Sequence, residues 1–184
     1  MLSYLPNVIT IGRMLLCAPI AMFIVWERYQ DAALLFVVAA ISDLVDGALA
    51  RGFGWGSAWG ALLDPVADKC LMLATLLSLM WMRVCPTWFC VLVIGRDLVV
   101  AGGAVAYRAL IGPYRVTPLW SGKLAIALQM LSCLVMLTQA GWGLSVLIVG
   151  LVLAVASLIS AWSCAAYVQI WWQRYTHART SGVS

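Results

Sequence analysis

The chain has 184 residues, of which 65% are hydrophobic and only 10% are charged. Its mean hydropathy is +1.01, whereas a soluble domain carries about a quarter of its residues charged. The composition therefore excludes an ordinary soluble domain and predicts an integral membrane protein in which residues 1–184 form one domain. The net charge of +4 comes from basic residues scattered between apolar runs, which predicts contact with a lipid bilayer and no nucleic-acid partner.

The cysteines and the single histidine exclude zinc and disulfide chemistry. No two of the six cysteines form a C-x-x-C pair, and all lie in apolar surroundings, so we interpret them as small buried side chains. His177 lies in the polar C-terminal tail, and one histidine without clustered cysteines cannot build a zinc site. Any metal chemistry must therefore use oxygen ligands.

Six apolar runs are long enough to cross a bilayer as helices, for which about 20 residues suffice. The N-terminus lacks a basic region followed by a small-residue cleavage site, so the first run is expected to be a retained span. The chain is thus predicted to be an all-α, polytopic membrane protein with six transmembrane helices at residues 8–26, 32–50, 61–81, 86–107, 119–140 and 144–172.

Basic residues in the connections predict the orientation of these spans. With six spans, both termini and the second and fourth connections share one side, which holds Arg51, Arg108, Arg115, Arg174 and Arg179. The opposite side holds only two arginines, at positions 28 and 83. Because cytoplasmic connections carry an excess of Lys and Arg, both termini are predicted to be cytoplasmic, in the inner (cytoplasmic) membrane of a cell.

Four of the seven acidic residues fall between positions 43 and 68, in what we call the aspartate motif: D-x2-D-G-x2-A-R-x8-G-x3-D-x3-D. Asp43 and Asp46 are three residues apart, and Asp64 and Asp68 are four apart, so on helices each pair shares one face. A short Gly-rich connection at residues 52–57 makes the two spans neighbours, and the four carboxylates are expected to converge. Unpaired anions repel, and divalent cations such as Mg²⁺ are the simplest remedy.

Other interpretations of the same residues stay open at this level. The aspartates are also suited to a proton or cation relay in a carrier, or to neutralisation by Arg51 and Lys69. Gly47, like the other small residues of the motif, suits close helix packing as well as close approach of a nucleotide. Arg51 is placed either to bind phosphate or to extend to the membrane interface.

The full aspartate motif resembles the signature of the CDP-alcohol phosphatidyltransferase family at every fixed position. The segments 6–13 (PNVITIGR) and 64–69 (DPVADK) are also similar to that family, as are Gly95-Arg96-Asp97 and Gly122-Lys123 followed by Gln129. The resemblance covers residues 5–130. It implies six transmembrane helices, a homodimer, and transfer of a phosphatidyl group from CDP-diacylglycerol to an alcohol with release of CMP.

The resemblance also implies roles for individual residues. Asp43, Asp46, Asp64 and Asp68 would hold two Mg²⁺ or Mn²⁺ ions, and Asp68 would also be the general base that deprotonates the acceptor hydroxyl. Contacts with the CDP moiety would come from Gly47, Arg51 and Ser57. Such a site at the cytoplasmic interface would admit a lipid donor from the bilayer and a soluble acceptor from water.

Two cations inside predicted spans, Arg96 and Lys123, are the candidates for binding the acceptor. They suit an anionic acceptor such as sn-glycerol 3-phosphate, with Arg108 and Arg115 as possible additions. The alternative is an Arg96–Asp97 ion pair with Lys123 extending to the interface. Ser-Gly-Lys followed by Gln is similar to the phosphatidylglycerophosphate synthase branch, whose acceptor is sn-glycerol 3-phosphate.

Asp97 and the Thr117-Pro118 pair resemble instead the cardiolipin synthase branch, whose acceptor is phosphatidylglycerol. A reading from another class, a cation- or proton-coupled membrane carrier, would use the same aspartates. The fixed spacing of Gly47, Ala50 and Arg51 favours the transferase, because a carrier has no need of it. A structural membrane subunit is the third reading, and it would tolerate Asp to Asn changes.

Overall fold

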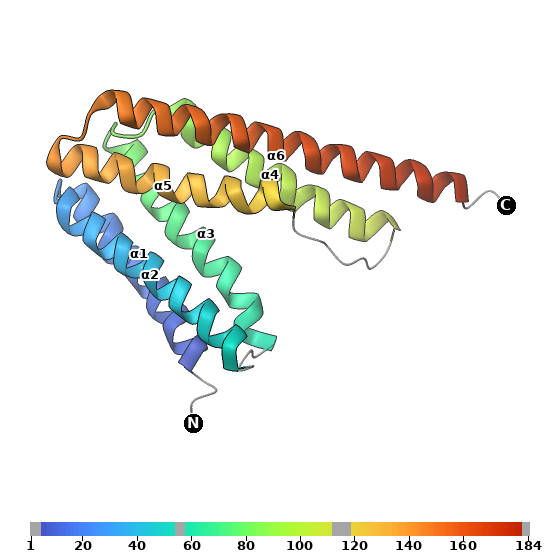
Figure 1. The fold of residues 1–184 in the computed structure, drawn as a ribbon, viewed down its shortest axis with the longest axis horizontal. Helices are drawn as coiled ribbons and strands as arrows, with labels where there is room; N and C mark the ends of the chain where they lie inside the picture. The colour runs from blue at the N-terminus through green and yellow to red at the C-terminus, as the bar shows by residue number, and fades with distance from the viewer. Residues whose placement is uncertain (1–4, 54–57, 112–118, 182–184) are drawn as a thin grey trace. The chain divides into compact units, whose positions relative to one another are not determined.

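The structure is a computed structural model that describes the backbone of residues 5–53, 58–111 and 119–181. Within these ranges it describes the side chains of residues 11–42, 66–106, 108, 119–173 and 176. The described residues form six α-helices and no strand (Figure 1): α1 (Leu5–Val25), α2 (Tyr29–Phe53), α3 (Ala58–Trp81), α4 (Thr87–Ile111), α5 (Trp120–Trp142) and α6 (Val146–Ser181). The predicted all-α class with six helices is confirmed.

Three helices are long and apolar enough to cross a membrane over their described residues. They are the stretches Thr87–Ala106 of α4, Trp120–Trp142 of α5 and Val146–Gln173 of α6. The described apolar stretches of α1 and α2, Ile11–Val25 and Tyr29–Ser42, are shorter. The chain therefore has the apolar helices of a membrane protein, as predicted, while the number of six crossings stays a prediction.

The helix ends agree with the predicted spans to within a few residues, except where a helix continues into polar sequence. α2 continues to Phe53, into the predicted Gly-rich connection, and residues 54–57 lie outside the described residues. α6 continues to Ser181, whereas its span was predicted to end at residue 172. Gln and Arg are good helix formers, so the helix does not stop where the apolar run stops.

Two connections contain a charged residue in the left-handed conformation. Glu27 (φ 61°) follows α1, and Arg83 (φ 59°) follows α3. After α1 the N–H of Arg28 donates to the carbonyl of Phe23 at 2.8 Å, the bond of a Schellman motif. The Arg28 guanidinium lies 4.9 Å from the centre of the Phe23 ring and 2.7 Å from Asp31. This side chain therefore links the end of α1 to the first turn of α2.

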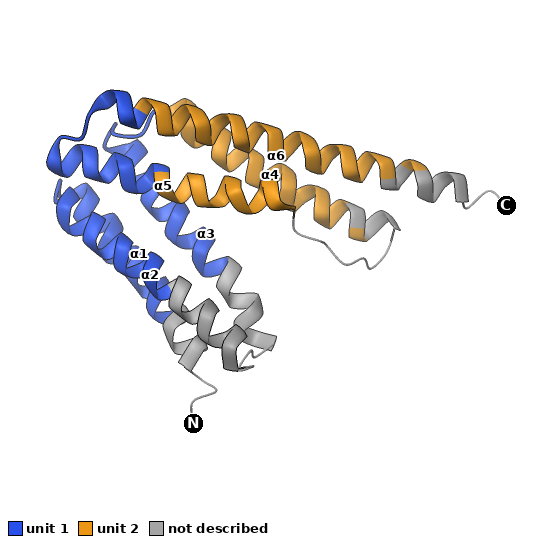
Figure 2. Ribbon diagram, viewed as in Figure 1, with its two compact units in different colours: residues 1–86, 132–149 blue, residues 87–131, 150–184 orange. Residues whose placement is uncertain are grey.

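The chain divides into two compact units (Figure 2). Unit 1 comprises residues 1–86 and 132–149, and unit 2 comprises residues 87–131 and 150–184. In unit 1, α1 packs against both α2 and α3. The buried apolar side chains of these three helices include Ile20, Ile24, Phe36, Leu71 and Leu76. Unit 1 thus contains both helices of the aspartate motif.

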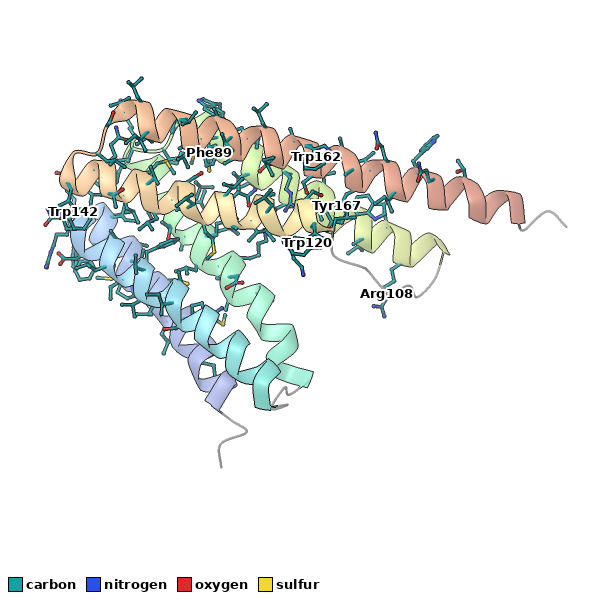
Figure 3. The ribbon with its side chains drawn as sticks, in the orientation of Figure 1. Phe89, Arg108, Trp120, Trp142, Trp162 and Tyr167 are labelled. Atoms are coloured by element: carbon teal, nitrogen blue, oxygen red, sulfur yellow. The ribbon has the colours of Figure 1, made fainter. Side chains whose placement is uncertain are left out.

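In unit 2, α6 has one buried stripe at spacings of three and four residues: Leu153, Ala156, Ser160, Ser163 and Tyr167. Ser160 accepts a hydrogen bond of 3.1 Å from Nε2 of Gln129 on α5. The hydroxyl of Tyr167, labelled in Figure 3, accepts a bond of 3.3 Å from the backbone N–H of Leu119, which precedes α5. Polar groups of α6 are therefore bonded to α5 and to the residue before it.

Gly103 of α4 packs against the ring of Trp171 on α6 so closely that a β-carbon there would overlap the ring. Gly103→Ala is therefore expected to displace the tryptophan and to lower the free energy of unfolding by about 1–3 kcal/mol. Gly102→Ala is the matched control, because a β-carbon at position 102 meets no atom within 4 Å. The melting temperatures of both variants in detergent measure the difference. Equal values would contradict the close packing.

Candidate active site

The four aspartates of the motif lie on two consecutive helices, on either side of residues 54–57. Asp43 and Asp46 belong to the second half of α2, and Asp64 and Asp68 belong to the first half of α3. Both pairs are therefore helical, as the prediction from their spacing requires. The side chains of Asp43, Asp46 and Asp64 lie outside the described residues, so their convergence stays a prediction.

The residues predicted to contact the CDP moiety belong to the same part of the chain. Gly47 and Arg51 are on α2, where the structure describes their backbone but not their contacts. Ser57 lies outside the described residues. Their assignment to the nucleotide therefore stays a prediction that rests on the spacing of the aspartate motif.

Asp68 is the motif carboxylate whose side chain the structure describes, and it forms an ion pair with Arg13 of α1. Nη1 of Arg13 donates to Oδ1 of Asp68 at 2.7 Å. The Arg13 side chain is 1% exposed and the Asp68 side chain is 31% exposed. Arg13 was not among the predicted site residues. The available signal was an arginine in an apolar run, because such a cation needs an acidic partner.

The oxygen donors of the motif fit a hard divalent cation. The Asp68 carboxylate is partly exposed, so an ion or a substrate group can reach it. Among the described side chains no group of three or more His, Cys, Asp or Glu is placed to hold a metal ion. Three of the four predicted ligands lie outside those side chains, and the predicted pair of ions stays a prediction.

Arg96 of α4 is 7% exposed and lies within unit 2. Its Nη1 donates to Asp97 at 2.8 Å, and its Nη2 donates to the hydroxyl of Ser163 on α6 at 3.0 Å. The structure thus contains the Arg96–Asp97 ion pair that was predicted as the alternative to acceptor binding, and it adds Ser163, which the sequence did not indicate. Nε of Arg96 is buried and has no hydrogen-bond partner among the described residues.

Lys123 lies in the first turn of α5 and is exposed. Its ammonium group lies 5.7 Å from the centre of the Trp120 ring. Arg108 is also exposed and projects from the end of α4 (Figure 3). Arg115 lies outside the described residues. Lys123 and Arg108 are thus exposed, whereas Arg96 is buried.

Comparisons with known proteins agree with the aspartate motif. The family model described as CDP-alcohol phosphatidyltransferase matches residues 3–167. A CDP-diacylglycerol–glycerol-3-phosphate 3-phosphatidyltransferase of Pseudomonas fluorescens is 33% identical, over 97% of this chain and 93% of that protein.

Two further relatives are longer than this chain. A chloroplastic/mitochondrial CDP-diacylglycerol–glycerol-3-phosphate 3-phosphatidyltransferase of Arabidopsis thaliana is 32% identical over 92% of this chain and 63% of its own length. A cardiolipin synthase (CMP-forming)/mitochondrial hydrolase fusion protein of Schizosaccharomyces pombe is 40% identical over 59% of this chain and 19% of its own length. The chain thus spans less than two thirds of either of these two relatives. With a family model that covers most of its residues, and with the fixed positions of the aspartate motif all present, the chain belongs to the CDP-alcohol phosphatidyltransferase family.

Proposed function

We propose that the chain is an enzyme of phospholipid biosynthesis that transfers a phosphatidyl group from CDP-diacylglycerol to sn-glycerol 3-phosphate and releases CMP. The observation that carries the proposal is the complete aspartate motif on α2 and α3 within a chain of this family. Relatives that carry the name of this activity support the choice of acceptor, including the one from Pseudomonas fluorescens. The whole chain would act as one domain.

In the proposed reaction the acceptor hydroxyl attacks the phosphorus of the phosphatidyl group, and the bond from that phosphorus to the CMP oxygen breaks. Asp68 takes the hydroxyl proton, which requires a carboxylate that substrates can reach, and its side chain is partly exposed. Two Mg²⁺ or Mn²⁺ ions would be held by Asp43, Asp46, Asp64 and Asp68. Their positive charge would offset the negative charge of the diphosphate and of the leaving CMP. Gly47, Arg51 and Ser57 would contact the CDP moiety.

The acceptor phosphate would be bound by Arg96, and Lys123 would contribute positive charge. A guanidinium has five N–H donors, and two nitrogens of Arg96 are engaged, by Asp97 and by Ser163. The Nε of Arg96 has no hydrogen-bond partner among the described residues, and it is the donor that we assign to the acceptor phosphate. Lys123 lies in an exposed position, which suits a longer-range electrostatic contribution rather than a buried contact.

The membrane location and the assembly are part of the same proposal. The excess of arginine on one side of the predicted spans supports a multi-pass protein of the cytoplasmic membrane with its active site on the cytoplasmic side. A homodimer is proposed from the family resemblance. Cross-linking in native membranes, followed by mass measurement, tests the dimer, and a monomer at all cross-linker concentrations would refute it.

The test of the proposed function is release of CMP by the purified full-length chain in detergent with CDP-diacylglycerol and Mg²⁺ or Mn²⁺. Glycerol 3-phosphate, phosphatidylglycerol, inositol and serine are offered in parallel. CMP is expected to be released with glycerol 3-phosphate and not with the other three acceptors. Flux of cations or protons across vesicles that contain the chain, with no CMP release from any acceptor, would favour the carrier reading instead.

Cardiolipin synthase activity, with phosphatidylglycerol as the acceptor, is the second candidate. Asp97, which pairs with Arg96, is the residue that departs from the glycerol-phosphate branch. The Schizosaccharomyces pombe relative, whose name includes cardiolipin synthase, also favours it. Release of CMP with phosphatidylglycerol and not with glycerol 3-phosphate would establish this candidate over the first.

Arg51→Ala is expected to raise the KM for CDP-diacylglycerol by about 10-fold to 100-fold, because a charge-assisted hydrogen bond to phosphate contributes about 1.5–3 kcal/mol. The KM for the acceptor is expected to stay near that of the parent. Initial rates of CMP release at varied donor concentration measure the effect. An unchanged KM for the donor would remove Arg51 from the nucleotide site and leave it an interfacial cation.

A further inference from the structure

Arg13 is a buried cation on α1 that pairs with a residue of α3. Its side chain is 1% exposed, and its Nη1 lies 2.7 Å from Oδ1 of Asp68, a residue 55 positions away in the sequence. An arginine on an apolar helix is costly without an acidic partner. The pair therefore fixes both the depth of Arg13 and the direction of the Asp68 carboxylate.

The charge of Arg13 also acts on the metal site of the proposed function, on which this inference rests. In the proposed function, Asp68 is one of the four carboxylates that bind divalent cations. A guanidinium in contact with such a carboxylate competes with a metal ion for the carboxylate oxygens, and its positive charge repels the metal ion. It also neutralises part of the negative charge of the motif when no metal ion is bound.

We propose that Arg13 is a positioning residue that holds Asp68 and acts as a resident counter-cation, which makes the aspartate site bind divalent cations less tightly than its carboxylates alone would. Arg13 thereby sets the cation concentration at which the site fills. A purely structural role, in which Arg13 only anchors α1 to α3, predicts a different result. Loss of the anchor would loosen the site and weaken cation binding, whereas loss of the counter-charge strengthens it.

The sign of the change therefore separates the two roles. Arg13→Met removes the charge and keeps an apolar side chain of similar length. The Mg²⁺ concentration at which half of the sites are filled, which we call the Mg²⁺ midpoint, is expected to fall about 10-fold. A tenfold change equals about 1.4 kcal/mol, which is modest for charges only a few ångströms apart at a partly screened site. Arg13→Lys keeps the charge, and its Mg²⁺ midpoint is expected to stay close to that of the parent.

The measurement is thermal unfolding of the full-length chain in detergent, first freed of metal by a chelator and then supplied with a series of Mg²⁺ or Mn²⁺ concentrations. It needs no lipid substrate and no turnover. Arg28→Met is the matched control, because Arg28 also lies 2.7 Å from an aspartate, Asp31, but both side chains are exposed. This control is expected to leave the Mg²⁺ midpoint unchanged.

Turnover supplies the second reading. At saturating Mg²⁺, Arg13→Met is expected to lower kcat for CMP release about 10-fold or more with little change in the KM for CDP-diacylglycerol, because Asp68 is no longer held in place. Tighter cation binding together with a lower kcat is the combination that a structural anchor does not produce. Partial recovery of kcat by Arg13→Lys supports the same conclusion.

The outcomes separate this inference from the proposed function. If the parent chain releases CMP and is stabilised by Mg²⁺, but Arg13→Met has an unchanged or higher midpoint, the inference alone is overturned. If the parent chain is not stabilised by any divalent cation, the proposed metal site and the inference fall together. Arg13→Gln carries the test if the methionine variant does not fold. If neither neutral variant folds while the lysine variant does, the charge serves folding and the inference is overturned.

Discussion

Asp68→Asn is expected to lower the rate of CMP release by about 10²–10⁴-fold, the range over which general acid–base catalysis contributes. The amide cannot take the proton of the acceptor hydroxyl, and it removes one unit of negative charge from the proposed metal site. The rate should be expressed per folded protein. Asparagine also removes the ion pair of Asp68 with the buried Arg13, and loss of this ion pair is expected to lower the melting temperature as well.

Two further variants make the result specific. Asp64→Asn changes a second motif aspartate on α3 and is expected to abolish turnover for the same electrostatic reason. Asp31→Asn is the control, since Asp31 is exposed, forms its ion pair with Arg28, and lies outside the motif; it is expected to keep the parent rate. CMP release at the parent rate in Asp64→Asn or in Asp68→Asn would remove that aspartate from the proposed metal site and from catalysis.

Arg96→Ala is the second large effect we expect, and it should be seen in the acceptor. The KM for glycerol 3-phosphate is expected to rise about 10-fold to 100-fold, because a hydrogen bond between charged groups contributes about 1.5–3 kcal/mol. The KM for CDP-diacylglycerol should change little. The variant also removes the ion pair between Arg96 and Asp97, so the melting temperature is measured alongside to show that the protein remains folded.

Ser163→Ala separates the charge of Arg96 from its surroundings. It removes a hydroxyl that accepts a bond of 3.0 Å from Arg96 but leaves the guanidinium and its ion pair with Asp97 in place. The acceptor KM of this variant is expected to change by only a few-fold. Lys123→Ala is expected to have a smaller effect than Arg96→Ala, because Lys123 is exposed. Unchanged acceptor kinetics in both Arg96→Ala and Lys123→Ala would remove these cations from the site.

The helices could be located from the sequence because the length of an apolar run alone largely decides where a membrane-type helix lies. Their ends were less accurate where polar residues continue a helix, as in α6, which reaches Ser181. Helix propensity does not distinguish an apolar run from the polar turns that follow it. The connection between the first two predicted spans is present where their bounds, residues 26 and 32, require it, although nothing in the sequence marks Glu27 as a left-handed residue.

The candidate site was predicted unevenly for a physical reason. Residues linked by helical spacing, such as the aspartate pairs, can be recognised because i, i+3 and i, i+4 positions share a face. The Arg96–Asp97 pair is adjacent in sequence and was also considered. The pairing of Arg13 with Asp68 and of Arg96 with Ser163 depends on which helix packs where, and no local pattern encodes that contact. A serine in an apolar helix, moreover, does not stand out from its neighbours.

The buried stripe of α6 limits how that helix can turn about its own axis. Ser160, Ser163 and Tyr167 bond to three different partners in unit 2, whereas smooth apolar surfaces would let a helix rotate with little penalty. One residue corresponds to a rotation of about 100°, so a one-residue insertion between Ser160 and Tyr167 would turn some of these hydroxyls away from their partners. The same insertion after Gln173 would leave all three bonds in phase. The polar groups of α6 thus fix its rotation about its own axis. Its C-terminal turns can vary in length without disturbing that alignment.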